Sequence, residues 1–593
     1  MKVFRRRRLL SVLLPAAAVL ASVAQIPLQV NERTSWREDS LPWKFDHGLW
    51  QTQTRSNLVF DGVSSLLQQW GNTRYRNGLN IVPATIPIGT LFYHGTWKEE
   101  APSGPEWVAT DPEHAYLFCR EMQDDQGCWM LTFAVTRPLK VLYFDGSSAA
   151  KMPGAMDSQD LIVWGEVKDE FLRLFDEKSR IEGLCEWGRK YGLDGFLRME
   201  PDFEVMVCDF TDALQVASAS NLIPGWRFPK TKDPKPPPRP RFDYNSFRVI
   251  EAGHWHNHFP GETRVQLDVS RLISFYDRDL FPSLATRLDS APANRWGHRV
   301  GNLTEAELKT LFSRLDEVLA GEPRGSGVDW TSNYRVVLHR YADRLEVVTY
   351  LVNDTVYETT MSFRERRTKV LEDTHEYIES MLAPYILNGV GPGRDARQRI
   401  SPHEHKSRSW ALPVWKKCAT THTKGISPSS LNRSERLLHR TVNEVLYEIC
   451  RVIVGIWAEG VEDLGLGKTV GGLEGPTLDE YDTQELETIR SKWRRQVVTL
   501  VNWLDWSVWV KCHPACSFEE TCYLRTWPWL PRLNFPAPPP KNDSDHEHHD
   551  LRSAVWGELR EEWRAYADGE APDDEDERVL PKCIRRIEPL EAP

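Results

Sequence analysis

Residues 106–116 read Glu-Trp-Val-Ala-Thr-Asp-Pro-Glu-His-Ala-Tyr, and this stretch decides the fold expected for the first third of the chain. Glu106–Ala109 is a short run of the kind found in buried strands. Thr110 stands where a helix cap belongs, Pro112 suits a first helical turn, and Glu113 completes a capping box. The stretch therefore predicts a strand that leads directly into a helix.

Similar short strands are expected on both sides of this stretch. A longer helix is expected over residues 167–190, ended by Gly192. This mixture of short strands and helices predicts an α+β domain over residues 85–225, while residues 25–84 give no assignment. The expected strands cover residues 91–93, 129–136, 140–144 and 203–209.

The character of the sequence changes at a proline-rich stretch. We interpret residues 226–244 as an extended linker, because they include the run Arg-Phe-Pro-Lys-Thr-Lys-Asp-Pro-Lys-Pro-Pro-Pro-Arg-Pro. Residues 245–530 then show helical spacing of apolar residues, with a capping box at Thr304 and a stop at Gly321, so we expect a mainly helical domain. Residues 531–593 are proline-rich and then acidic, which favours a disordered tail.

The first 24 residues predict a secretory signal peptide. Lys2 and four arginines precede an apolar run over residues 9–23, and Ser22 and Ala24 are small residues at the −3 and −1 positions of a cleavage site. The run is short for a membrane span of about 20 residues. An uncleaved N-terminal anchor remains the alternative. No later run of 18 apolar residues is present, so we expect no other membrane segment.

The ten cysteines and the sequons agree with export. An even number of cysteines suits an oxidising compartment, and three of them, Cys512, Cys516 and Cys522, are spaced for a disulfide knot rather than a zinc site. Four glycosylation sequons begin at Asn302, Asn353, Asn432 and Asn542, although such triplets also occur by chance. We therefore expect a secreted glycoprotein with disulfide bonds.

The composition excludes some partners. The chain of 593 residues has 40% hydrophobic residues and a net charge of −11, which indicates a globular protein without the basic surface that nucleic acid requires. Its 24 tryptophans suit buried anchors or stacking platforms. The histidines of the tail segment 546–549 are expected to be solvated rather than metal-bound.

Three pieces of the first domain together resemble the H-Y-E group of ADP-ribosyltransferases, which includes the poly(ADP-ribose) polymerases. The pieces are Tyr-His-Gly-Thr at 93–96, the strand beginning at Glu106 that runs into the helix through Tyr116, and Phe-Glu-Val-Met-Val at 203–207 after Tyr-Gly-Leu-Asp-Gly at 191–195. The resemblance covers residues 85–220, and Trp107 stands where the family has tyrosine. The whole chain also resembles a group of uncharacterised secreted proteins of filamentous fungi, which implies no activity.

This resemblance implies an α+β ADP-ribosyltransferase-like domain that uses NAD⁺ as its substrate. Cleavage of the nicotinamide–ribose bond builds positive charge on the sugar, and a carboxylate stabilises that charge. Glu204 is the candidate carboxylate, and His94 would bind a ribose hydroxyl. Trp107 would stack on the nicotinamide ring. The expected NAD-binding residues are His94, Gly95, Thr96, Trp107 and Tyr116.

Alternatives to this enzyme remain open. Glu200 would share the face of Glu204 if both lay in one strand, which makes it a weaker second carboxylate. In an extended strand, His254, His256 and His258 would share one face and could bind zinc, although no carboxylate partner is evident in the sequence. A third possibility is a non-catalytic interaction protein on the same scaffold. The acceptor, whether a protein or a small molecule, is not indicated.

Overall fold

The computed structural model describes most of the chain between residues 43 and 590. The described ranges are 43–49, 54–74, 77–119, 127–168, 171–223, 244–289, 295–321, 325–353, 361–392, 408–467, 477–524 and 580–590. The expected signal peptide, nearly all of the expected linker and the histidines at 546–549 lie outside these ranges.

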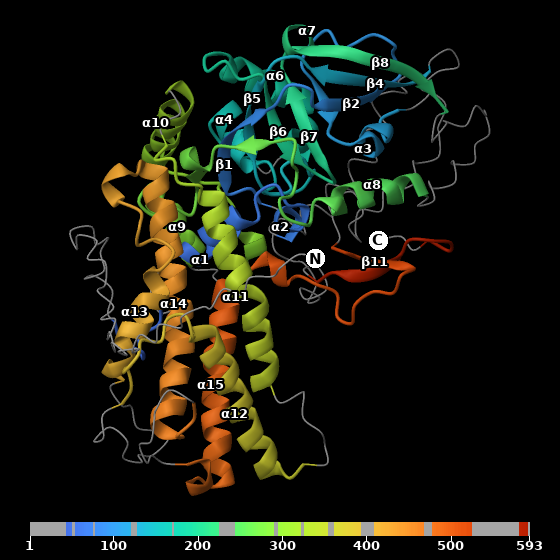
Figure 1. Cartoon of the computed structure of the whole chain (residues 1–593). Coiled ribbons are helices and arrows are strands. Elements are labelled where there is room, and N and C mark those ends of the chain that lie inside the picture. Colours follow the sequence, from blue (N-terminus) through green and yellow to red (C-terminus); the bar gives the residue numbers. More distant parts are fainter. Residues whose placement is uncertain are drawn as a thin grey trace, which may run out of the picture. The chain divides into compact units, whose positions relative to one another are not determined.

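The first part of the chain forms a mixed sheet with the order β10-β1-β5-β6-β7-β3-β2-β4-β8, and β9 pairs with β1 (Figure 1). In the described sheet the β5–β6 pair is parallel, and the other strand pairs are antiparallel. The sheet contains β1 (Asn80–Ile86), β2 (Leu91–Thr96), β3 (Glu106–Ala109), β4 (Cys128–Val135), β5 (Leu139–Phe144), β6 (Gly195–Met199), β7 (Phe203–Val207), β8 (Leu214–Leu222), β9 (Gln266–Leu267) and β10 (Ile273–Ser274).

The five strands expected from the sequence are confirmed as β2, β3, β4, β5 and β7. The sheet extends beyond residues 85–225, because β1 begins at Asn80 and β9 and β10 follow the proline-rich stretch. β9 and β10 are two residues long each, which is too short for a sequence pattern. The α+β character of this region is therefore established, with a sheet that recruits strands from both sides.

Short helices accompany this sheet. They are α1 (Ser56–Ser64), α2 (Gln69–Arg74), α3 (Pro112–Tyr116), α4 (Asp157–Trp164), α5 (Phe171–Phe175), α6 (Glu177–Arg189) and α7 (Phe210–Ala213). The expected helix at 167–190 is instead split into α5 and α6, because the Asp176 side chain accepts from the Ser179 amide and starts a new helix. The capping box expected at Thr110 does not form: Asp111 is the N-cap of α3 and makes no side-chain cap.

Long helices dominate the region that follows. Capping boxes begin α10, α12, α14 and α15, which confirms the one expected at Thr304. The helix expected over residues 485–510 ends earlier, at Leu504, because Asp505 takes a left-handed conformation. The elements are α8 (Tyr244–Trp255), α9 (Pro282–Asp289), α10 (Glu305–Ala320), α11 (Trp330–Val352), α12 (Phe363–Leu382), α13 (Leu412–Thr420), α14 (Arg433–Asp463) and α15 (Thr483–Leu504).

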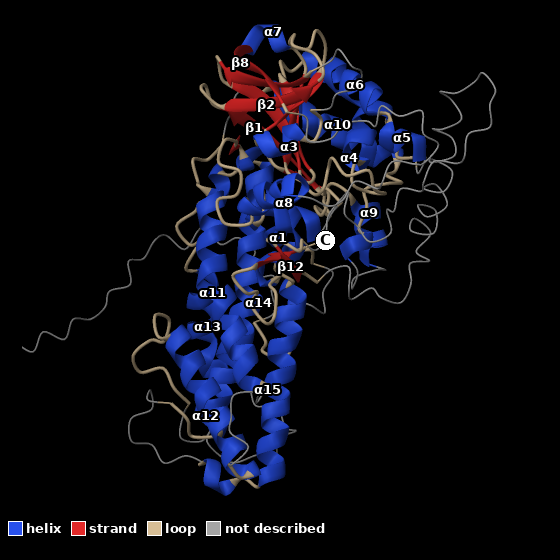
Figure 2. Ribbon diagram, turned by 90° about the vertical axis from the view of Figure 1, so that its right-hand side faces the viewer, coloured by secondary structure: helices blue, strands red, loops and turns tan. Residues whose placement is uncertain are grey.

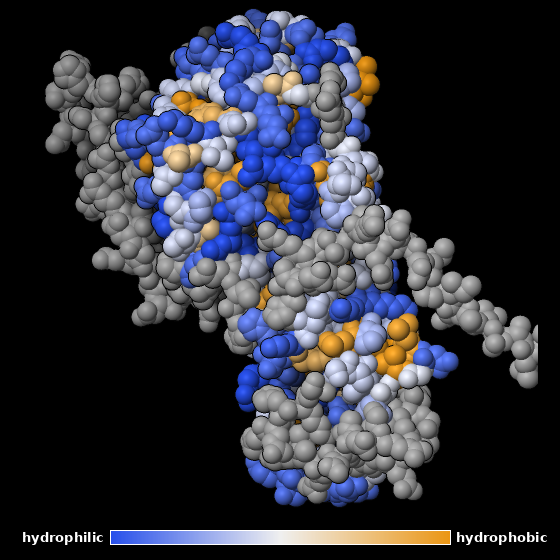
Figure 3. Space-filling view, turned by 90° about the vertical axis from the view of Figure 1, so that its left-hand side faces the viewer, coloured by the Kyte–Doolittle hydropathy of each residue, from blue (hydrophilic) through white to orange (hydrophobic). Residues whose placement is uncertain are grey.

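These helices pack around α14, which is buried along most of its length. α14 contacts α1, α12, α13 and α15. Figures 1 and 2 show the long helices α12, α14 and α15 running side by side. Trp415, Trp457, Trp493 and Trp506 are almost fully buried, so tryptophan serves here as a packing anchor. No described helix is long and apolar enough to cross a membrane. On the face in Figure 3, hydrophobic residues form separate patches among hydrophilic ones.

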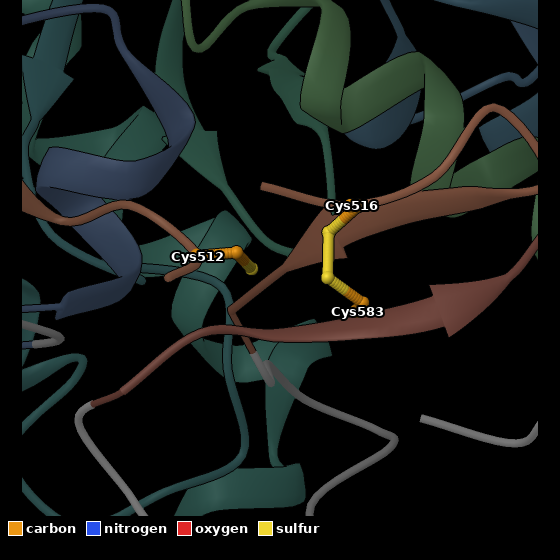
Figure 4. A group of neighbouring side chains, drawn as sticks. All are labelled: Cys512, Cys516 and Cys583. Carbon is orange, nitrogen blue, oxygen red and sulfur yellow. A yellow bond between two sulfur atoms is a disulfide. The ribbon is translucent and has the colours of Figure 1, made fainter. Parts of the chain in front are cut away.

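All ten cysteines form disulfide bonds, and the disulfide cluster expected near Cys512 is confirmed. The expectation of a disordered tail is wrong for its end. β12 (Lys582–Arg585) pairs with β11 (Glu520–Tyr523), and the Cys516–Cys583 bond joins the two segments (Figure 4). The other bonds are Cys119–Cys128, Cys185–Cys208, Cys418–Cys450 and Cys512–Cys522.

Candidate functional site

The residues proposed for NAD⁺ lie where two neighbouring strands of the sheet separate. β2 and β3 pair at Tyr93–Ala109. Beyond this pair the two strands separate, and β2 stays paired with β4 while β3 stays paired with β7. Glu204 on β7 lies opposite Ala109 on β3. The structure therefore brings the three sequence pieces onto the adjacent strands β2, β3 and β7.

His94 lies just beyond the point where the strands separate. Its Nδ1 lies 2.7 Å from the carbonyl oxygen of Trp107 and donates to it in the matching tautomer. Burial lowers the pKa of His94, and the hydrogen bond to Trp107 offsets only part of this effect, so the neutral ring is favoured. Nε2 makes no hydrogen bond within the described part of the chain.

Trp107 and Glu204 project from the same face of the sheet. Their strands pair in register at Trp107–Met206 and Ala109–Glu204, and residues two apart share a face. The indole Nε1 of Trp107 is buried without a hydrogen-bond partner among the described residues. His94 differs: strand alternation from Tyr93 directs its side chain to the opposite face.

Glu204 belongs to a buried cluster of four charges, two positive and two negative. Its Oε1 accepts from Nε of Arg198 at 3.0 Å and from Nη2 at 2.5 Å. Arg198 also donates from Nη1 to Oε2 of Glu177 at 3.0 Å, and Lys151 pairs with Glu177. Glu204 is only 8% exposed. The acid is thus held in a fixed position rather than directed into solvent.

Gly95 is covered by the short helix α3. A Cβ atom at Gly95 would lie 2.0 Å from the carbonyl oxygen of Ala115, so only glycine allows this close approach. The Tyr116 hydroxyl donates to the carbonyl oxygen of Ile223 at 2.6 Å, and Thr96 Oγ1 accepts from the Lys98 amide at 3.4 Å. Gly95, Thr96 and Tyr116 thus have structural contacts of their own.

Two expectations about other residues are wrong. Glu200 lies before β7, in the turn after β6, so it does not share a strand face with Glu204. The segment 254–258 is not a strand. His254 lies in the last turn of α8, and the chain then turns, so the three histidine rings do not line one face.

The three histidines have separate surroundings. Nδ1 of His254 lies 2.8 Å from Nδ2 of Asn257, and burial lowers the pKa of His254 to about 4. His258 is exposed. Nε2 of His256 lies 3.1 Å from Oδ2 of Asp111, in a group that also contains Asp202. Of the three histidines, only His256 therefore has carboxylate neighbours among the described residues, and the sequence had not indicated them.

Sequence reasoning missed Arg198, Asp111 and Asp202 as members of these sites. Arg198 carried one usable signal, because it interrupts an otherwise apolar strand, Gly-Phe-Leu-Arg-Met. Asp111 and Asp202 resembled ordinary acids in turns.

The matches with known proteins cover this region and extend beyond it. A family model described as the YPL277C N-terminal domain matches residues 52–128 and 120–225. The Saccharomyces cerevisiae protein named Uncharacterized protein YOR389W is 23% identical to this chain, over 84% of the chain and 85% of the relative. Uncharacterized protein YPL277C of the same yeast is 26% identical, over 50% of the chain and 76% of the relative. The chain is thus similar to yeast proteins whose names state no activity, and the matched family model spans α1 through β8, including the separation of β2 from β3.

Proposed function

We propose that the sheet region is an ADP-ribosyltransferase-like domain that binds NAD⁺ and cleaves its nicotinamide–ribose bond. The observation that carries the proposal is the placement of His94, Trp107 and Glu204 on three adjacent strands, beside the point where β2 and β3 part. An interruption in strand pairing leaves backbone groups available to a ligand.

In this proposal Glu204 is the carboxylate that stabilises the sugar cation, and its fixed, buried position supports that role. In the proposed reaction the nicotinamide departs with the bonding electron pair, and the sugar becomes a cation that water or another nucleophile attacks. A fixed, water-shielded carboxylate stabilises that cation more than the neutral ground state. Both hydrogen bonds of Glu204 within the described residues are accepted by Oε1. Oε2 is the oxygen that we assign to the sugar.

Two further polar atoms near the separation of β2 and β3 are available to a ligand, one on each face of the sheet. The indole Nε1 of Trp107 is buried without a partner among the described residues, and a ribose or carboxamide oxygen would satisfy it. Nε2 of the neutral His94 would accept from a ribose hydroxyl while Nδ1 remains on the Trp107 carbonyl. In this role tryptophan replaces the family's tyrosine as a stacking surface and as a donor.

We also propose that the protein is exported. The pairing of all ten cysteines supports an oxidising compartment. Glycosylation at Asn432 is disfavoured, because this residue caps α14, its amide donates to the carbonyl oxygen of Ser270 and the sequon's Ser434 is buried. Asn302 is exposed and is the better acceptor. Mapping of glycans on the secreted protein tests this assignment.

The test of the enzyme is nicotinamide release from NAD⁺ by the purified full chain. Glu204→Gln keeps the shape of the side chain but removes its charge, and we expect turnover to fall by at least about a hundredfold. Glu177→Gln is the matched control, because it removes the other carboxylate partner of Arg198 on helix α6. We expect Glu177→Gln to retain turnover within a few-fold. Equal losses in the two variants, or no turnover by the wild type, would reject the proposal.

A specific observation favours a second candidate, a non-catalytic interaction protein. The carbonyl of Ala115 occupies the space over Gly95, and the side chain of His94 alternates to the face opposite Glu204. Under this candidate the polar residues hold the sheet together and the fold is retained without its chemistry. Absence of NAD⁺ binding in calorimetry, by a protein that is folded by circular dichroism, would favour it over the enzyme.

A further inference from the structure

A second group of titratable side chains lies at the starts of α3 and β7, and the proposed reaction does not use it. Asp111 is the N-cap of α3, Asp202 precedes β7, and His256 and Glu262 come from the chain after α8. Nε2 of His256 lies 3.1 Å from Oδ2 of Asp111 and 3.5 Å from both Oδ1 of Asp202 and Oε2 of Glu262. Ligand atoms of Asp111, Asp202 and His256 all lie within 4.8 Å of one another.

One carboxylate oxygen in this group lacks a partner. Asp202 is fully buried, and its Oδ1 accepts from the Phe203 amide at 2.7 Å. Its Oδ2 is buried and has no hydrogen-bond partner among the described residues. A buried carboxylate oxygen without a donor or a cation is costly. A bound cation, or a proton shared with Asp111, would satisfy this oxygen.

The charges of the group favour a cation as its ligand. Asp111, Asp202 and Glu262 contribute three negative charges, and Arg264 contributes one positive charge through bonds to Asp111 and Glu262 at 2.9 and 2.5 Å. With the neutral His256 that metal binding requires, the sum is −2, which one divalent cation balances. Without an ion, burial alone would lower the pKa of His256, but Asp111, Asp202 and Glu262 raise it, so a proton on the ring offsets part of the same charge.

We propose that Asp111, Asp202, Glu262 and the Nε2 of His256 bind one divalent transition-metal ion, Mn²⁺ or Zn²⁺. Carboxylates alone would suit Mg²⁺ or Ca²⁺, whereas an imidazole ligand shifts the preference toward these two ions. Arg264 contacts two of the ligands and fixes their orientation, as second-sphere partners do in metal sites.

The backbone around the proposed ligands is held in place. The Glu262 amide donates to the carbonyl oxygen of Leu67 at 2.9 Å, and a Cβ atom at Gly261 would lie 2.1 Å from the same oxygen. The ring of Phe203 lies edge-on to His256, with 5.4 Å between their centroids. The ligands need little rearrangement to bind an ion.

The ion would join two distant parts of the sequence. Asp111 and Asp202 belong to the sheet region, whereas His256 and Glu262 follow the proline-rich stretch. Asp202 is two residues from Glu204, so the ion would also fix the start of the strand that carries the proposed catalytic acid. This inference does not depend on NAD⁺ cleavage.

The test is calorimetric titration of the chelator-treated, oxidised full chain with Mn²⁺ and with Zn²⁺. We expect one site of micromolar or tighter affinity and a rise in melting temperature on binding. Asp202→Asn removes the unpartnered oxygen's charge, and His256→Gln removes the nitrogen ligand. Each variant should lose more than about a hundredfold in affinity, with Mg²⁺ and Ca²⁺ binding more weakly to the wild type.

The controls separate this site from other metal ligands and from the proposed enzyme. The histidines at 546–549 would contribute binding that Asp202→Asn leaves unchanged, and the disulfide cysteines are not ligands while the protein is oxidised. Glu204→Gln should lose NAD⁺ turnover but bind the metal normally. Identical titrations of the wild type, Asp202→Asn and His256→Gln, all folded by circular dichroism, would overturn the proposal.

Discussion

The two buried charge clusters of the sheet region differ in their balance. Around Arg198, two cations meet two carboxylates, and the bonds between them satisfy the group internally. Around His256, three carboxylates meet one arginine, and an oxygen of Asp202 remains without a partner. A balanced cluster holds its own strands together, whereas an unbalanced one requires a proton or a cation.

The largest expected effect comes from breaking the balanced cluster. Arg198→Met leaves Glu177 and Glu204 buried with Lys151 as the remaining cation of the cluster. Loss of one partner from a buried ion pair costs about 3–5 kcal/mol. We expect that loss in the free energy of unfolding, measured with urea at pH 7. A change below about 1 kcal/mol would mean that the cluster contributes little to folding.

A smaller effect is expected on the stability of the protein at low pH. Burial alone would raise the pKa of Glu177, but Arg198 and Lys151 outweigh it and lower the pKa to about 2. The folded-state pKa is depressed, so this carboxylate contributes stability above its unfolded pKa, near 4.5, that is lost as the pH falls toward 2. Between pH 5 and pH 2 the wild type should lose on the order of 2 kcal/mol more than Glu177→Gln. Parallel losses in urea titrations across this range would contradict the assignment.

The smallest effect has the opposite sign and belongs to the unbalanced cluster. In the metal-free protein Asp202→Asn removes one of three negative charges, and its amide can donate to the neighbouring Asp111. We expect a gain of about 1 kcal/mol in the free energy of unfolding at pH 7. Urea titration after chelator treatment measures it. Clear destabilisation would show that Asp202 is already satisfied in the metal-free protein.

The sequence predicted elements best where the signal was local. The capping box at Thr304 and the apolar spacing that follows it correctly predicted a helix that ends before Gly321. The box expected at Thr110 failed because Asp111 occupies the cap and turns its carboxylate toward His256 and Arg264. Here a contact between residues far apart in sequence outweighed a weak local preference.

Some residues of the candidate sites could be predicted from local sequence, and others could not. His94, Trp107 and Glu204 could be selected from the sequence, because each lies in a short motif of a known type. Their neighbours could not, because Arg198 and Glu177 gain meaning only through contact with Glu204 and with each other. The expected zinc strand failed because periodicity cannot distinguish a strand from the end of a helix in so short a segment.

By itself the sequence determined the α+β character of the first region, the helices of the second and the disulfide cluster near Cys512, because local propensity and cysteine spacing encode these features. Only the tertiary structure decided which charges meet. In it Cys583 bonds to Cys516, the strands β1, β9 and β10 join the sheet, and Asp111, Asp202 and Glu262 lie around His256. Such contacts depend on chain reversals between distant segments, which no local pattern records.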